Sequence, residues 1–202
     1  MKRFALAASL AALLPVQAHA ASNTFTFPLT VSGGAATCLP KAQGTVTVHS
    51  FGPFENMEVV VSDLPANTGF DLFNIEVPNG PFGLAWYLGD IQTDSTGTGV
   101  LNVVGRFNRE TFIISPGVPK TAPPNIFHKP PAVVPEATTG IATNPVQIYH
   151  LGLWFNSSAD ALKAKCPATP TPFNGEHNAG IQVLNTGSPA FPDNKGPLLS
   201  VP

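Results

Sequence analysis

The chain has 202 residues, of which 43% are hydrophobic and 11% charged, and it contains 18 glycines and 22 prolines. This length fits one domain and leaves no room for a second large one. The formal net charge is −2 and the few basic residues do not cluster. A nucleic-acid-binding protein needs a basic surface, so nucleic acid is excluded from the expected partners.

The first twenty residues have the three parts of a secretory signal peptide. Lys2 and Arg3 form a positive start, residues 4–14 an apolar stretch, and residues 18–20 a cleavage site of the small-x-small type. The apolar stretch is too short to cross a bilayer as a helix, and no later stretch reaches the roughly 20 apolar residues required. We therefore expect cleavage after Ala20 and a secreted or periplasmic protein of residues 21–202, without a stable transmembrane anchor.

The mature chain is a series of short β-type runs separated by turn residues. In residues 24–27 and 45–48 the apolar side chains take one face and the threonines the other, as in a half-buried strand. The pattern predicts an all-β fold, an antiparallel β-sandwich of about 8–10 strands, with a β-barrel as the alternative. The predicted strands are residues 24–31, 45–51, 57–63, 70–77, 83–93, 99–104, 106–115, 146–155, 180–185 and, as a further candidate, 198–201.

One short helix is predicted at residues 159–165, because a serine can cap its start and Pro167 stops it. Cys166 follows this helix, and Cys38 is the only other cysteine. An oxidising compartment favours their pairing, so we expect a Cys38–Cys166 disulfide that ties the helix to the segment around Cys38. The alternatives are two unpaired thiols, or a metal-binding or catalytic thiol.

Residues 116–145 differ in composition from the rest of the chain. They are rich in proline, which lacks a backbone donor and cannot occupy the interior of a sheet. We expect a long surface insertion in an extended or polyproline II conformation. It is either a plain surface loop or a binding loop.

Residues 57–115 resemble immunoglobulin-like and fibronectin type III-like β-sandwiches of secreted bacterial proteins. The resemblance rests on the run from Val59 to Leu72, in which a strand is followed by Leu64-Pro65, Thr68 and the next strand. In these folds a tyrosine often follows this corner and binds its backbone. Phe70 fills the core position here without that bond. Residues 93–99 match the hairpin turns of such domains, with Asp94 supplying the turn chemistry. The resemblance implies an architecture and no particular chemistry.

Histidines raise the possibility of a metal site, because imidazole and carboxylate groups bind zinc, copper or non-haem iron. The ligands would be His150, Glu176 and His177, with His128 added from the proline-rich insertion. Their spacing matches no known ligand motif. On an alternating strand such as that of His150, a packed and hydrogen-bonded histidine is the other interpretation.

Two segments are candidates for ligand binding. The loop that contains Asn174, Glu176, His177 and Asn178 is dense in polar side chains, although these can also serve the local backbone. Trp86 and Tyr87 are neighbours on a predicted strand and must point to opposite faces, so one ring meets solvent unless both faces are covered. An exposed ring could stack on a sugar or a partner protein.

Motifs for nucleophilic catalysis are absent, since no G-x-S-x-G sequence occurs. Carboxylates at 55, 58, 76, 90, 110 and 176 leave open a glycosidase pair. The sequence thus favours a secreted β-sandwich that binds a ligand, a glycan or an envelope protein, or has a structural role, without a cofactor. The alternative is an extracytoplasmic enzyme that uses one transition metal ion at His150, Glu176 and His177.

Overall fold

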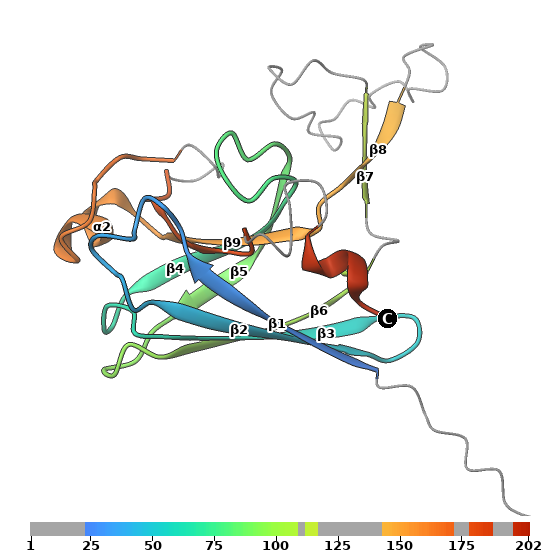
Figure 1. The fold of residues 1–202 in the computed structure, drawn as a ribbon, viewed down its shortest axis with the longest axis horizontal. Coiled ribbons are helices and arrows are strands. Elements are labelled where there is room, and N and C mark those ends of the chain that lie inside the picture. The colour runs from blue at the N-terminus through green and yellow to red at the C-terminus, as the bar shows by residue number, and fades with distance from the viewer. Residues whose placement is uncertain (1–22, 109–111, 117–142, 172–177, 188–195) are drawn as a thin grey trace, which may run out of the picture.

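The computed structural model describes residues 23–108, 112–116, 143–171, 178–187 and 196–202 (Figure 1). These ranges form strands and two short helical elements. In chain order they are β1 (Thr24–Val31), β2 (Gln43–Ser50), β3 (Glu55–Ser62), β4 (Gly69–Ile75), β5 (Ala85–Gln92), β6 (Gly99–Gly105), β7 (Phe112–Pro116), β8 (Thr143–Gln147), β9 (His150–Phe155), helix α2 (Ser158–Lys163), β10 (Gln182–Asn185) and the 3-10 helix η1 (Pro197–Ser200).

Eight strands form one antiparallel sheet in the order β5-β4-β9-β10-β1-β2-β3-β6, so the predicted all-β, antiparallel class is confirmed. Strand β1 joins the two halves, because residues Thr24 to Leu29 pair with β2 while Thr30 and Val31 pair with β10. The sheet curls at β1, and the half containing β2, β3 and β6 faces the half containing β4, β5 and β9 (Figure 1). The result is close to a barrel, although no ladder joins the end strands β5 and β6.

The main hydrophobic core lies inside this curled sheet. Phe27, Leu29, Val46 and Val48 point inward and are almost fully buried, whereas the residues between them, Pro28 and Thr47, face outward, in keeping with the predicted alternation. Phe70 from the opposite half is also fully buried in this core. The core position predicted for Phe70 is therefore confirmed.

The half containing β4, β9 and β10 is buried on both faces. Every residue of β9 and β10 is buried, as is every residue of β4 after Gly69. The inner side chains join the main core, and the outer ones form a second cluster around Trp154. Such two-sided burial explains the nearly continuous apolar sequence of β9, HLGLWF.

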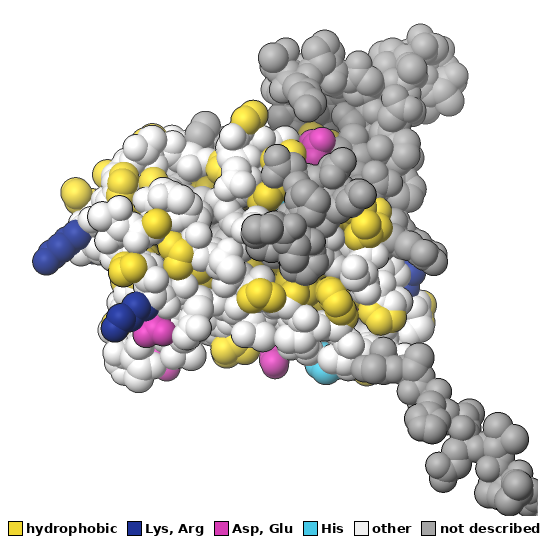
Figure 2. All heavy atoms as spheres, in the orientation of Figure 1, with side chains coloured by type: hydrophobic (Ala, Val, Ile, Leu, Met, Phe, Trp, Pro, Cys, Tyr) yellow, Lys and Arg dark blue, Asp and Glu magenta, His cyan; other side chains and the backbone are white. Residues whose placement is uncertain are grey.

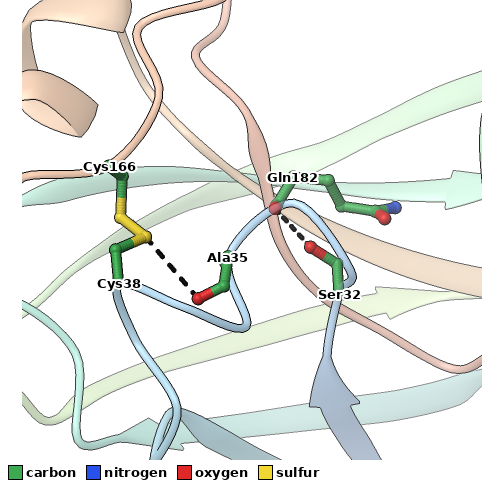
Figure 3. The surroundings of a disulfide bond; sticks show 5 residues. All are labelled: Ser32, Ala35, Cys38, Cys166 and Gln182. Atoms are coloured by element: carbon green, nitrogen blue, oxygen red, sulfur yellow. Dashed lines mark hydrogen bonds between the residues drawn. A yellow bond between two sulfur atoms is a disulfide. The ribbon is translucent and has the colours of Figure 1, made fainter.

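The predicted disulfide is present between Cys38 and Cys166, 128 residues apart in the sequence (Figure 3). Helix α2 begins at Ser158, is capped by the Ser157 side chain and ends three residues before Cys166, close to the predicted 159–165. Nearby, the hydroxyl of Ser32 donates to the carbonyl of Gln182 (Figure 3). The disulfide thus ties the segment after β1 to the segment after α2.

The turn between β5 and β6 packs on the corner between β3 and β4. The side chain of Asp94 accepts hydrogen bonds from the backbone nitrogens of Thr96 and Thr98, at 2.7 and 3.1 Å. Gly97 has a φ of +81°, and a Cβ there would lie 2.1 Å from the carbonyl oxygen of Leu64. The turn predicted at 93–99 is confirmed, and it packs on the predicted Leu64 corner between β3 and β4.

Three predicted strands need correction. Residues 198–201 form no strand, because Pro197 starts the 3-10 helix η1, whose Leu198 enters the main core. Residues 106–108 form no strand, because they are bound to the buried Glu55, and residues 112–115 belong to β7; residues 109–111 lie outside the described part of the chain. Residues 146–155 are two strands, β8 and β9, because the chain passes at Ile148 and Tyr149 from one sheet to another.

Strands β7 and β8 form a separate two-stranded ribbon that extends away from the main sheet (Figure 1). It contains Pro116 and Pro145, so the predicted proline-rich insertion begins and ends within paired strands. Both strands lie at an edge, where proline is tolerated. Residues 117–142 are outside the described part of the chain. In the described part, no helix is long and apolar enough to cross a membrane.

Candidate binding face

Four aromatic rings form a connected row on the outer side of β4, β5 and β9, which we call the outer aromatic face. Tyr87 packs on Phe73 at 5.5 Å between ring centroids, Phe73 on Trp154 at 5.6 Å, and Trp154 on Phe82 at 5.0 Å. All three contacts are edge-to-face, the geometry that aromatic quadrupoles favour. The row is therefore a rigid structure that runs from the buried Trp154 outward to Tyr87.

Tyr87 is the accessible end of this row. Its side chain is 49% exposed, whereas Phe73 is 3% and Trp154 0% exposed. Its hydroxyl lies 2.7 Å from Oδ1 of Asp90, to which it donates a hydrogen bond. One edge of the ring rests on Phe73 and the hydroxyl is held by Asp90, so the ring is fixed in place while its free surface faces solvent.

Trp86 lies on the other face of the same strand, as predicted. Its register partner is Asn74, which in turn is the partner of Leu151 in the main core. Trp86 is nevertheless 60% exposed, because β5 is the end strand of the sheet and no described residue continues the sheet beyond it. The sequence predicted that at least one of the two rings meets solvent. The structure shows that both do.

Two aspartates lie directly opposite each other on the outer aromatic face. Asp71 of β4 is paired with Asp90 of β5 on one side and with Trp154 of β9 on the other. Directly opposed residues have Cβ atoms about 5 Å apart. Asp71 is only 1% exposed, whereas Asp90 is exposed. The face therefore offers one accessible carboxylate beside Tyr87.

The loop between β4 and β5, residues 76–84, covers part of the outer side. The side-chain amides of Gln182 and Asn185 donate to the carbonyl oxygen of Pro78, at 3.0 and 3.1 Å. Asn185 also donates to Oε1 of Gln182 at 2.9 Å. These bonds hold the loop over β10, and Phe82 from the loop packs on Trp154. The loop thus covers the outer aromatic face around Trp154, whereas Tyr87 at the other end of the row remains exposed.

The predicted polar loop starts and ends beside this face. Thr171 and Ala179 form an isolated β-bridge, with the nitrogen of Thr171 2.8 Å from the carbonyl oxygen of Ala179. Ala179 is fully buried and belongs to the same cluster as Phe73 and Trp154. Asn178 is described and exposed. Asn174, Glu176 and His177 lie outside the described residues. The structure thus brings the base of this loop and Tyr87 to one side of the sheet.

His150 lies at the start of β9 and is fully buried. Its Nδ1 is 2.8 Å from the hydroxyl oxygen of Thr186, so it is packed and hydrogen-bonded, as one of the two interpretations predicted. Gly180, after the polar loop, is bound to Phe155 at the other end of β9, about 17 Å along the strand. Within the described residues no three His, Cys, Asp or Glu side chains could hold a metal ion. The other proposed ligands, His128, Glu176 and His177, lie outside them.

Among the described residues, the carboxylates considered for a glycosidase pair lie in separate places. Glu55 is buried against residues 106–108, Glu58 lies half-buried on β3, and Glu76 accepts from the nitrogen of Leu84 at 3.1 Å. Glu110 and Glu176 are outside the described residues. The neighbour of Asp90 is Asp71, which sequence reasoning missed. The sequence feature that could have pointed to Asp71 is its charge between the apolar residues Phe70 and Leu72.

The chain is poor in charged residues, at 11%, and Figure 2 shows scattered hydrophobic side chains with few acidic or basic ones on the visible face. No known protein-family model matches the chain. No curated protein matches it either.

Proposed function

We propose that this is a secreted or periplasmic protein that binds a glycan without catalysing a reaction. The observation that carries the proposal is the pair of large exposed rings, Trp86 and Tyr87, on the end strand β5. Soluble proteins seldom leave neighbouring aromatic rings of this size open to water unless a partner covers them. Because the two rings face opposite ways, a ligand that contacts both must run along the edge of β5.

The geometry around Tyr87 favours a sugar. An aromatic ring presents a flat apolar surface to the C–H groups of a pyranose. Asp90 adds a carboxylate acceptor for sugar hydroxyl groups within reach of the ring. Since Phe73 and Asp90 hold Tyr87 in position, little side-chain entropy is lost when a ligand binds.

Export is supported by the disulfide, because such bonds form and persist in oxidising compartments. The signal-peptide features of residues 1–20 point the same way. Expression of the full chain in a bacterium tests this part. We expect the protein in the periplasmic or extracellular fraction with Ala21 as its first residue. A cytoplasmic, unprocessed chain with reduced cysteines would contradict it.

Binding is tested with the mature chain on a glycan array, followed by calorimetry with the best ligand. We expect Trp86→Ala and Tyr87→Ala each to weaken binding at least tenfold, about 1.4 kcal/mol. Phe54→Ala is the matched control, since Phe54 is 45% exposed and lies in the turn between β2 and β3. Absence of glycan binding, or an equal loss in the Phe54 variant, would overturn the glycan proposal. Capture of an envelope protein that depends on Trp86 and Tyr87 would identify the other class of ligand.

We also propose that the curled sheet is a β-sandwich related in architecture to immunoglobulin-like and fibronectin type III-like domains. Support comes from the two facing halves and from the Leu64 corner, whose Pro65 carbonyl accepts from the Thr93 hydroxyl at 2.6 Å. Amide hydrogen exchange distinguishes a sandwich from a closed barrel. In a sandwich, the amides of β5 that point away from β4 exchange rapidly. Slow exchange along the whole of β5 would show a closed barrel, in which β5 pairs with β6.

A further inference from the structure

The two end strands of the sheet differ in how well they resist pairing with another strand. Strand β5 carries Asp90 and a bulge, where the register with β4 shifts between Leu72 and Phe73. Bulges and charges are common devices that keep sheet edges from pairing. Strand β6 has neither, since it pairs with β3 in unbroken register and its sequence, GVLNVVG, contains no charged residue and no proline.

The free side of β6 has no partner within the described part of the chain. β6 is the last strand of the sheet, and the backbone of residues 100–104 makes no hydrogen bond to any other described residue outside its ladder with β3. Strand β5 approaches β6 from the inner side. A Cβ on Gly99 would point into the core and lie 2.5 Å from Cγ2 of Ile91. β5 therefore contacts the inner face of β6, and the hydrogen-bonding edge beside β6 is open.

The sequence of β6 is nearly symmetric about its central residue, Asn102. Gly99 mirrors Gly105, Val100 mirrors Val104, and Leu101 mirrors Val103. If two copies of β6 pair antiparallel about Asn102, Val100 of one copy lies opposite Val104 of the other. Val100 and Val104 are 53% and 68% exposed, so each gains an apolar neighbour where it now faces water.

From these observations we propose that β6 is a dimerisation edge, on which a second copy of this chain adds its own β6 antiparallel about Asn102. The contact is isologous and closes after two copies. Strand β5, with its bulge and Asp90, does not extend the assembly further. Charge does not oppose the contact, because Glu58, the register partner of Asn102 on β3, would lie about 14 Å from its counterpart, three strand spacings away.

Cysteine cross-linking tests the register. In the proposed dimer residue 102 lies opposite itself with Cα atoms about 5 Å apart, a separation that a disulfide can span. We expect Asn102→Cys to form a covalent dimer under mild oxidation. Val100→Cys alone should not, since its copies lie about 14 Å apart along the strand, but a mixture with Val104→Cys should cross-link. Thr45→Cys, exposed on β2, is the matched control. Cross-linking of Asn102→Cys no greater than that of Thr45→Cys would overturn the proposal.

Sedimentation velocity tests the assembly without cysteines. We expect the mature wild-type chain to sediment as a dimer over a wide range of concentration. The double variant Val100→Lys/Val104→Lys should sediment as a monomer, because it places lysines opposite each other on the pairing edge. Both substituted residues are exposed, so circular dichroism should stay unchanged. Thr45→Lys should remain dimeric. A wild-type protein that stays monomeric throughout, or a double variant that stays dimeric, would overturn the proposal.

Discussion

The backbone nitrogen of Phe107 donates a 2.7 Å hydrogen bond to Oε2 of Glu55, a side chain that is only 1% exposed. The same carboxylate accepts from Nδ2 of Asn108 at 3.2 Å and lies 3.3 Å from Nη1 of Arg106. Three consecutive residues after β6 are thus bound to the first residue of β3. This interaction ends β6 and directs the chain out of the sheet.

Replacing Glu55 should therefore destabilise the fold. Glu55→Ala leaves the Phe107 nitrogen and the Asn108 amide without their acceptor in a buried place, which costs about 2–3 kcal/mol. Glu55→Gln keeps one oxygen acceptor and should cost less. Urea unfolding measures both. Glu58→Ala, on the same strand but half-buried, is the control, and an equal loss in that variant would contradict the role given to Glu55.

Removal of the disulfide should lower the free energy of unfolding more than the loss of any hydrogen bond to Glu55. The bond closes a loop of 128 residues, for which the chain-entropy relation gives about 5 kcal/mol. We expect the Cys38→Ala/Cys166→Ala variant to unfold at much lower urea concentration than the oxidised wild type. The reduced wild type should behave like the variant. Equal midpoints with and without reductant would contradict this expectation.

Asp94 should link stability to acid pH. The hydroxyl of Thr96, and then the amides of Thr98 and Thr96, hold the pKa of Asp94 below its usual value of 3.8. A carboxylate whose pKa is lowered by folding stabilises the native state at neutral pH, and this contribution is lost as the pH falls through the folded pKa. We expect Asp94→Asn to be less stable than wild type at pH 7 and the difference to shrink below about pH 4. A difference that stays constant over this range would contradict the assignment.

The two tryptophans should report separately on the two faces of the sheet. Trp86 is 60% exposed and Trp154 is 0% exposed. We expect iodide to quench one component of the intrinsic fluorescence and to leave the other untouched. Trp86→Phe should remove the quenched component and shift the remaining emission to the blue. An emission from the Trp86→Phe variant that iodide still quenches would show that Trp154 is open to solvent.

The metal content of the purified protein distinguishes the proposed binding protein from the alternative metal-dependent enzyme. Because His150 is buried and hydrogen-bonded to Thr186, we expect protein purified without added metal to hold less than one equivalent of zinc, copper or iron. Elemental analysis and thermal shift on addition of these ions measure this. A stoichiometric metal that is lost in His177→Ala would favour the enzyme hypothesis and contradict the proposed non-catalytic role.

Local patterns predicted most of the fold. The alternation of threonine with valine or phenylalanine located β1 and β2, and serine and proline bounded α2 closely. The signal-peptide features of residues 1–20, together with the presence of two cysteines, predicted the Cys38–Cys166 bond. Strand boundaries were wrong where a distant residue decides the backbone, as Glu55 does at Phe107 and as the core does for Leu198.

The candidate site was predictable only in part. Adjacency of Trp86 and Tyr87 on one strand predicted an exposed ring, because side chains alternate along a strand. That Tyr87 packs on Phe73 and lies near the base of the polar loop depends on β4 and β9 being neighbours. These strands are about 80 residues apart in the sequence, and no local pattern encodes their pairing.

Leu198 and Val201 complete an interior whose first members, Phe27 and Leu29, come from the opposite end of the chain. The strand that pairs with the end of β1 is also late, at Gln182–Asn185. The interior is therefore complete only when segments from both sides of the sequence have met. A truncation that removes residues 197–201 would take Leu198 and Val201 out of the core and expose the apolar side chains that they cover.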